Sequence, residues 1–309
     1  MITRKNFLKH ASVLAAGSLL PLNISGDLFN RFNGQKITIL YTNDTHARLD
    51  PFPENARRFA GLGGIARRAS LVKKVRAQEK NVLLLDGGDV FQGTPWFDVY
   101  GGKVDLELMT EMQYDAMVVG NHEFDRGLEG FAEAAQKAGF PILASNYLTR
   151  NTPMHPHVQR QIIKEFDGFR IGIFGLGIQF NGVVDPKLYG EVISQDPVSV
   201  ARRGVESLRN FHYCDYVICL SHLGFQYQNG RIDDITLATS VEGIDLIIGG
   251  HTHTFLDEPV IIENPSGKKT TITHMGHSGV RVGRIDIDIS GIGQYTAIQS
   301  RYYIIDGQS

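Results

Sequence analysis

The feature that most constrains how this chain can fold is an alternation of short apolar runs with longer amphipathic stretches. The runs are rich in Val, Ile and Leu, and they lie at residues 37–42, 82–88, 116–120, 141–146, 170–177, 216–222 and 246–251. Near-continuous apolar strands that alternate with helices are typical of sheets that are buried on both faces. The alternation therefore predicts an α/β fold.

Five amphipathic stretches between these runs are predicted to form helices, at residues 64–78, 104–113, 128–138, 198–211 and 233–240. In the first of them Ile65, Ala69 and Val72 share one face, as expected of a helix that covers a sheet. An Asp-Gly turn at residues 167–168 separates two strand-like runs and favours a hairpin. Residues 268–289 indicate two further strands. We therefore expect antiparallel pairs beside the parallel units.

Charge and cysteine content exclude several classes of protein. The 309 residues include 31 Lys+Arg and 33 Asp+Glu, so no basic excess predicts binding to nucleic acid or to an anionic membrane. Two cysteines, Cys214 and Cys219, are too few for a disulfide framework. Both lie in one apolar stretch, so we expect buried thiols without a redox role.

Residues 1–25 differ in composition from the rest of the chain. Arg4, Lys5 and Lys9 precede an apolar, small-residue run at 11–22, which is too short for a stable membrane span. The pattern is typical of an export signal and resembles the twin-arginine type, with Lys5 where the second arginine usually stands. We expect an exported, periplasmic protein. The alternative is a frayed amphipathic N-terminus.

Five of the apolar runs end at side chains that can bind metal ions. In chain order these side chains are Asp44 and His46, Asp89, Asn121 with His122 and Asp125, His222, and His251 with His253. Taken singly, such an Asp is more commonly a helix cap and such a His a hydrogen-bonded core or surface residue. In open α/β sheets, however, ligands gather at the carboxyl ends of strands. Five strands that deliver these side chains to one edge favour a shared site.

The chemistry of the set predicts divalent cations. Imidazole, carboxylate and amide oxygen suit Zn, Mn, Fe or similar ions, and no thiolate belongs to the set. Seven candidate ligands are too many for one four-coordinate ion, but they suit two ions that share one carboxylate. We interpret the spacing of Asp44 with His46, and of His251 with His253, as pairs on extended segments whose side chains point the same way.

Five ordered motifs make the chain resemble the calcineurin-like metallophosphoesterase superfamily and, within it, the N-terminal catalytic domain of 5′-nucleotidases. The motifs are TNDTHARLDPF, LLLDGGDVFQGTP, YDAMVVGNHEFDRG, SHLG and GGHTHT. The resemblance covers residues 36–290, which we expect to form one catalytic domain, followed by a strand-rich tail at 291–309. It implies a four-layer αββα sandwich of two mixed sheets flanked by helices.

The resemblance also implies a role for each side chain at the strand ends. One ion would be held by Asp44, His46, Asp89 and His253. The other would be held by Asp89, Asn121, His222 and His251, so that Asp89 bridges the two ions. His122 and Asp125 match the catalytic dyad of the family. Asn121 and His122 would stabilise charge on the substrate phosphate.

The implied function is hydrolysis of phosphate monoesters, with nucleotides as the expected substrates, by a water whose pKa the two ions lower. Cyclic-nucleotide phosphodiesterase and broad phosphatase activities are alternatives. A metal-dependent binding module without turnover is the alternative from another class, and the His122–Asp125 dyad favours an enzyme. The glycines of residues 87–93 do not match the P-loop pattern.

The resemblance leaves nucleobase recognition open, because full-length 5′-nucleotidases carry a second, C-terminal domain that grips the base. Three possibilities follow: the chain accepts many small phosphate esters, a separate chain supplies the base-binding domain, or loops of this domain bind the base. We expect a separate chain. Glu123 is expected to support the ligand residues. His274 and His277 either line the rim of the site or occupy ordinary loops, and His155 and His157 are expected in an exposed loop.

Overall fold

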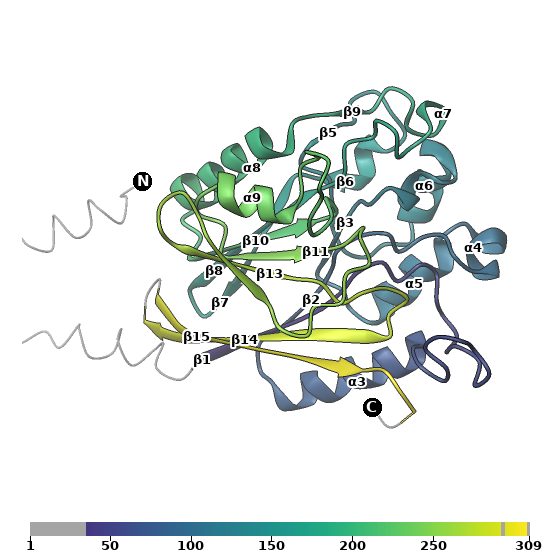
Figure 1. Cartoon of the computed structure of the whole chain (residues 1–309), viewed down its shortest axis with the longest axis horizontal. Helices are drawn as coiled ribbons and strands as arrows, with labels where there is room; N and C mark the ends of the chain where they lie inside the picture. Colours follow the sequence, from purple (N-terminus) through teal and green to yellow (C-terminus); the bar gives the residue numbers. More distant parts are fainter. Residues whose placement is uncertain (1–34, 292–293, 308–309) are drawn as a thin grey trace, which may run out of the picture.

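Two mixed β-sheets pack face to face in the computed structural model, which describes residues 35–291 and 294–307 (Figure 1). The predicted export signal at 1–25 lies outside the described residues. No helix within the described ranges is long and apolar enough to cross a membrane.

The first sheet has seven strands, and its central part is parallel. The spatial order is β15 (Gln294–Ile304), β14 (Arg281–Gly291), β1 (Gln35–Thr42), β2 (Val82–Asp86), β3 (Ala116–Val118), β4 (Ile142–Leu143) and β6 (Val158–Gln159). The five strands from β1 to β6 in this order pair in parallel, whereas β14 and β15 add an antiparallel edge.

The second sheet has six strands and is also mixed. Its two edge pairs, β12–β13 and β7–β8, are antiparallel, and the other neighbours are parallel. The order is β12 (Val260–Glu263), β13 (Lys269–Thr273), β11 (Leu246–Gly249), β10 (Tyr216–Ser221), β8 (Phe169–Leu176) and β7 (Gln161–Phe166). A small two-stranded sheet pairs β5 (Tyr147–Leu148) with β9 (Ile193–Ser194).

Helices lie against the outer face of each sheet. The first sheet is covered by α3 (Ile65–Gln78), α4 (Pro95–Tyr100), α5 (Lys103–Glu111) and α6 (Gly127–Ala135). The second is covered by α8 (Pro197–Glu206) and α9 (Asp234–Ser240). Shorter helical segments are η2 (His122–Phe124), η3 (His155–His157), α7 (Pro186–Tyr189) and a π turn (Ser207–Phe211) that prolongs α8.

The alternation of side chains along the strands produces the layers. In β1, Ile37, Ile39 and Tyr41 belong to the core between the sheets, whereas Leu40 packs under the helices. In β10 the even-numbered apolar residues likewise face the other sheet, and Cys219 faces α8 and α9. This is the period of two expected for strands. It confirms the predicted αββα sandwich, and both cysteines are buried free thiols, as predicted.

The sequence-based element bounds differ from the structure mainly at short segments. The run at 141–146 contains only a two-residue strand, and α4 and α7 were not predicted.

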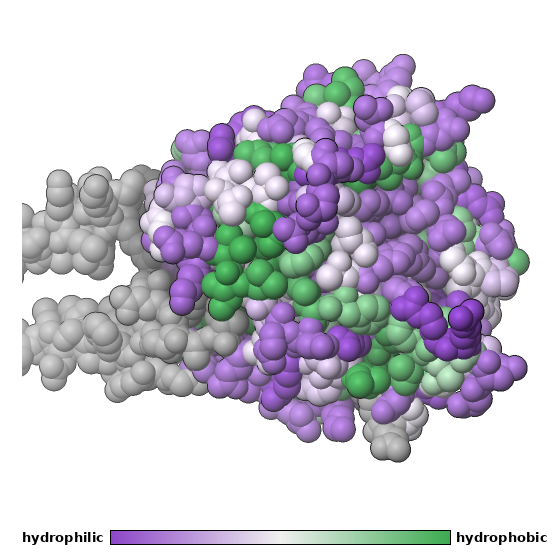
Figure 2. Space-filling model, in the orientation of Figure 1, coloured by the Kyte–Doolittle hydropathy of each residue, from purple (hydrophilic) through white to green (hydrophobic). Residues whose placement is uncertain are grey.

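Hydrophilic residues dominate the face shown in Figure 2, with an apolar area over β12 and β13. The ends of the parallel strands meet at one side of the molecule, where the polar motifs follow them.

Candidate metal centre

The seven predicted ligands converge where parallel strands of both sheets end. Six of them form two groups in which the potential ligand atoms lie within 4.8 Å of one another. The groups are Asp44, His46 and His253, and Asp89, His222 and His251. Asn121 joins the second group, because its Oδ1 lies 2.7 Å from His251 Nδ1. The two groups are in contact, since the backbone amide of His251 donates to both carboxylate oxygens of Asp44.

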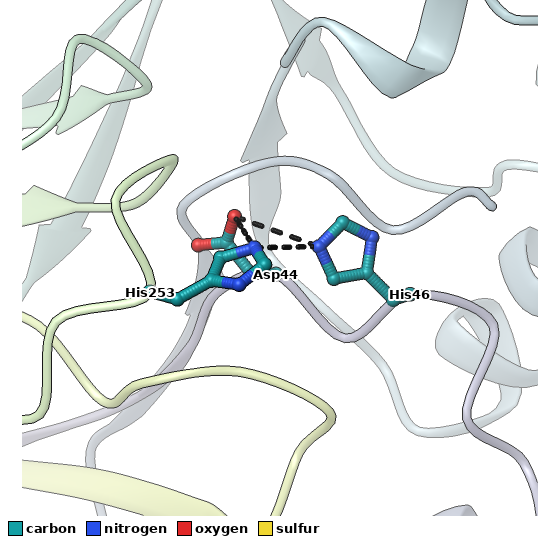
Figure 3. A group of neighbouring side chains, drawn as sticks. All are labelled: Asp44, His46 and His253. Carbon is teal, nitrogen blue, oxygen red and sulfur yellow. Dashed lines mark hydrogen bonds and ion pairs between the residues drawn. The ribbon is translucent and has the colours of Figure 1, made fainter. Parts of the chain in front are cut away.

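In the first group, two imidazoles meet over one carboxylate (Figure 3). The Nε2 atoms of His46 and His253 are 2.8 Å apart, and Asp44 Oδ1 lies 3.3 Å from His253 Nε2 and 3.9 Å from His46 Nε2. Asp44 and His46 are buried, whereas the His253 side chain is 41% exposed. The group is therefore open to solvent on one side.

The tautomers of two ligands are set by backbone carbonyls. His46 Nδ1 lies 3.1 Å from Phe91 O, and His222 Nδ1 lies 2.7 Å from Gly87 O. A carbonyl accepts only, so each Nδ1 donates and each neutral imidazole carries its lone pair on Nε2. Histidines that bind metals commonly donate their other ring N–H in this way.

The surroundings of one buried atom support the fit of these donors to a cation. His222 Nε2 is buried without a hydrogen-bond partner, although Asp89 Oδ2 lies only 3.0 Å away. A buried polar atom without a partner is costly. A divalent ion would satisfy both His222 Nε2 and Asp89 Oδ2, and imidazole with carboxylate suits Zn, Mn or Fe.

The electrostatics of the second group also favour positive charge. Burial opposes charge on His222, but Asp89 and Asp44 outweigh it and raise the pKa of His222 to about 10. Burial alone would raise the pKa of Asp89, yet attraction to His222 holds it below its usual range. Burial and the neighbouring His222 lower the pKa of His251 to about 4. A cation beside Asp89 would supply the charge that His222 otherwise has to carry.

Five of the seven predicted ligands have left-handed backbone conformations. The φ angles are 50° at Asp44, 51° at His46, 55° at Asp89, 74° at His251 and 53° at His253. The interpretation of both pairs as extended segments is therefore wrong. The side chains converge because tight turns after the strands aim them, and backbone strain of this kind concentrates at functional sites.

Two glycines allow the turns to approach closely. A Cβ at Gly120 would overlap Asp89 Oδ1, and one at Gly250 would lie 2.9 Å from Asp44 Oδ2. Any larger residue at either position would displace a ligand carboxylate.

The predicted dyad lies beside the first group. His122 Nδ1 is 2.8 Å from Asp125 Oδ2, and the His122 ring centroid is 5.3 Å from that of His46. The His122 amide also donates to Asp89 Oδ1 over 2.8 Å. Burial opposes charge on His122, but the hydrogen bond to Asp125 and the nearby Asp89 raise its pKa above the usual value.

Two supporting residues hold the ligand loops by hydrogen bonds. The buried Glu123 carboxylate accepts four backbone amides, from Asp89, Val90, Phe91 and Gly120, at 2.6–3.2 Å. Asn43, which sequence reasoning missed, donates to Asp44 Oδ2 and to Gly276 O and accepts from the Met275 amide. The only feature of the sequence that could have indicated Asn43 is its position directly before Asp44.

The two histidines left open by the sequence have different positions. His274 is fully buried, with Nε2 2.6 Å from Asp234 Oδ2, and Asp234 Oδ1 accepts from Ser221 Oγ over 2.5 Å. His277 stacks on His253, with ring centroids 4.8 Å apart, so it lines the rim of the centre. Burial and His253 lower the pKa of His277 to about 4. His155 and His157 lie in η3 at the surface.

With this geometry established, comparison with known proteins defines the class. The family model of calcineurin-like phosphoesterases matches residues 37–255, which is more than half of the chain. The chain belongs to the calcineurin-like phosphoesterase family, as its motifs predicted.

Its relatives within the family include 5′-nucleotidases. The chain is 36% identical over 230 residues to a snake venom 5′-nucleotidase of Naja atra, covering 72% of this chain and 42% of that protein. It is 34% identical over 264 residues to the 5′-nucleotidase of Homo sapiens, covering 82% of this chain and 44% of that protein. The chain thus spans less than half the length of these relatives.

Solved structures give the same comparison. A 5′-nucleotidase precursor from Thermus thermophilus matches with a TM-score of 0.78 and 31% identity, covering 88% of this chain and 55% of that one. The calcineurin-like phosphoesterase YfkN from Bacillus subtilis matches with a TM-score of 0.67 and 25% identity, covering 88% of this chain and 91% of that one.

Proposed function

We propose that this chain is a di-metal phosphomonoesterase that hydrolyses nucleotides. The two ions would share Asp89. Asp44, His46, Asp89 and His253 would hold one ion, and Asp89, Asn121, His222 and His251 would hold the other. The observation that carries the proposal is the convergence of two donor groups beside the His122–Asp125 pair. The similarity to 5′-nucleotidases supports nucleotides as substrates.

Divalent ions, when bound, polarise the phosphate oxygens and lower the pKa of the attacking water. The chain itself binds and orients the phosphate through Asn121 and His122. Because His122 Nδ1 faces Asp125, Nε2 is the atom that donates to a phosphoryl oxygen. Asp125 fixes this orientation and favours the charged imidazolium, which can also donate a proton to the leaving oxygen.

A small substrate panel tests this function. We expect AMP and p-nitrophenyl phosphate to be hydrolysed, hydrolysis to stop with a chelator, and Mn²⁺ to restore it. Faster turnover of bis-p-nitrophenyl phosphate than of either monoester would favour a diesterase instead. A manganese-loaded protein that binds AMP without hydrolysing any of the three would be a binding module, contrary to the proposal.

Two expectations from the sequence remain proposals. We infer export to the periplasm from the composition of residues 1–25, and it is tested by the cellular fraction and the N-terminus of the mature protein. A separate chain that supplies a nucleobase-binding domain is tested by co-purification from the native source. Purification of this chain alone, with high kcat/KM for AMP, would contradict the separate chain.

A further inference from the structure

A group of aromatic rings extends outward from the metal centre. His277 stacks on the ligand His253, with centroids 4.8 Å apart and an interplanar angle of 27°. The ring of Phe59 meets that of His277 edge-on, with centroids 5.2 Å apart. The centroid of the Phe255 ring lies 5.8 Å from each of these two centroids. Phe52 extends the group, 5.6 Å from Phe59. We call Phe52, Phe59, Phe255 and His277 the aromatic wall.

The wall is not part of the closed core. All four side chains are half-buried, in contrast to the core phenylalanines, which are almost completely buried. None of them belongs to the three core clusters of the described residues. Aromatic surface therefore remains accessible beside the metal centre.

The backbone holds Phe59 in place against a conformational cost. Phe59 has φ 59°, a left-handed conformation that is uncommon and strained for a bulky residue. The loop is closed by hydrogen bonds from the Phe52 amide to Leu62 O, from the Gly61 amide to Phe52 O and from the Leu62 amide to Phe59 O. This turn directs the Phe59 ring at His277 and Phe255.

Phe255 and Phe59 make further close contacts, with a glycine and with two arginines. A Cβ at Gly276, which has φ 78°, would overlap the Phe255 ring. The Arg58 guanidinium lies 5.2 Å from the Phe59 ring centroid, and that of Arg281 lies 4.9 Å from the Phe255 centroid. The wall thus combines exposed ring surface with cations, and both features bind the π-face of a base.

We propose that the aromatic wall stacks the base of a nucleotide whose phosphate lies at the metal centre, with Phe59 as the main stacking ring. The inference rests on the proposed phosphoesterase function. It is the alternative to a separate base-binding chain, because it makes loops of this domain the source of base recognition. Two ring-to-ring steps, of 4.8 and 5.2 Å, connect the ligand His253 with Phe59. Because every base has a π-face, the wall selects nucleotides over other phosphate esters without selecting one base.

The test compares AMP with ribose 5-phosphate, which has the same phosphate and sugar but no base. The wild type should show the lower KM for AMP. Phe59→Leu keeps apolar volume but removes the ring, and we expect it to raise KM for AMP by about fivefold or more, the lower range for a lost stacking contact. Its KM for ribose 5-phosphate and its kcat should not change. Phe59→Trp should retain the low KM for AMP.

A matched control separates recognition from folding. Phe211 is 71% exposed and lies before β10, whereas the metal centre lies after it, so Phe211→Leu should leave both KM values unchanged. Adenosine should inhibit the wild type competitively and Phe59→Leu much more weakly, and ribose should inhibit neither.

Equal KM values for AMP and ribose 5-phosphate in the wild type would overturn the aromatic wall and leave the phosphoesterase intact. A Phe59→Leu variant with a lower Tm but unchanged KM for AMP would show a structural role only and would also overturn it. Failure to hydrolyse either ester in the manganese-loaded wild type would instead overturn the proposed function.

Discussion

Side chains around the strand ends have distinct tasks. The proposed ligand residues present lone pairs, and backbone groups orient them. Phe91 O and Gly87 O orient two imidazoles, and the His251 amide orients Asp44. His122 differs from them, because the acceptor at its Nδ1 is the carboxylate of Asp125 and not a backbone carbonyl. We propose that its Nε2 binds the substrate phosphate.

Replacing His122 tests this division of tasks. We expect His122→Ala to keep the metal content of the wild type, since the imidazole is not a proposed ligand. The kcat for AMP should fall by roughly 10²-fold or more, the usual effect of removing a positioned acid or base. Steady-state kinetics with elemental analysis measure both. Unchanged kcat would remove His122 from the mechanism.

Replacing Asp89 tests the bridge. Asp89→Ala should lose bound metal and activity together, because the carboxylate is proposed to contact both ions. The exposed Glu107 on α5 provides a control, and Glu107→Ala should keep both. Elemental analysis of the two purified variants decides the question. A full complement of ions in Asp89→Ala would show that the carboxylate does not bridge.

Single residues also show which parts of the site could be predicted. Asp44, Asp89 and His222 lie within three residues of the ends of apolar strands, so strand ends alone locate them. Asp234 could not be found in this way, because it lies in the first turn of α9 and its partner His274 is 40 residues away. Local sequence indicates an exposed helix start there, and only tertiary packing buries the carboxylate.

At the scale of elements, a buried network ties two strands to a helix. Asp234 of α9 accepts from Ser221 at the end of β10, and it contacts His274 just after β13. All three residues are 0% exposed. Gly249 of β11 makes room for the network, since a Cβ there would overlap both Asp234 and His274. The network thus supports the strand end that carries His222.

Breaking this network should destabilise the fold. Asp234→Ala leaves the polar atoms of Ser221 and His274 buried without their partner, which we expect to cost about 3 kcal/mol in the free energy of unfolding. The exposed Thr239 on the same helix is the control, and Thr239→Ala should change stability by less than about 0.5 kcal/mol. Urea denaturation measures both. Equal stability of the two variants would contradict the structural role.

The end of β2 predicts a pH dependence. Burial raises the pKa of Asp86 to about 7, and the hydrogen bonds from Thr42 and Gly88 only partly oppose it. A carboxyl whose folded pKa exceeds its unfolded value contributes stability at low pH and loses it as pH rises toward the folded pKa. Between pH 5 and 7 the wild type should lose about 2 kcal/mol relative to Asp86→Asn.

This loss can be measured by urea denaturation of both proteins in chelator at the two pH values. The difference between them isolates Asp86, because other titrating groups are common to both. An Asp86→Asn variant whose stability changes with pH in parallel with the wild type would show that Asp86 does not titrate in this window.

Long elements were easier to predict than short ones. Strands β1, β8 and β10 and helix α3 have apolar patterns that extend over several residues, so periodicity indicates their type. Strands β4 and β6 have two residues each and are defined by neighbours in the sheet. The left-handed turns at the ligands were not predicted either, because Asp and His at these positions are equally compatible with extended backbone.

At the scale of the whole molecule, the four layers explain why distant motifs form one centre. Parallel strands of both sheets end on the same side, so the loop after β1 meets the loop after β11 although 207 residues separate Asp44 from His251. The same arrangement places the loop of Phe59 beside the loop of Phe255. The alternation of strands and helices predicted the layers, whereas the packing of these loops required the structure.

The most direct measurement is an anomalous diffraction map from crystals of the manganese-loaded protein. Two peaks are predicted, one among Asp44, His46 and His253 and the other among Asp89, His222 and His251, with Asp89 between them. A single peak, or peaks outside both groups in a crystal of active protein, would contradict the two-ion centre on which the proposed hydrolysis depends.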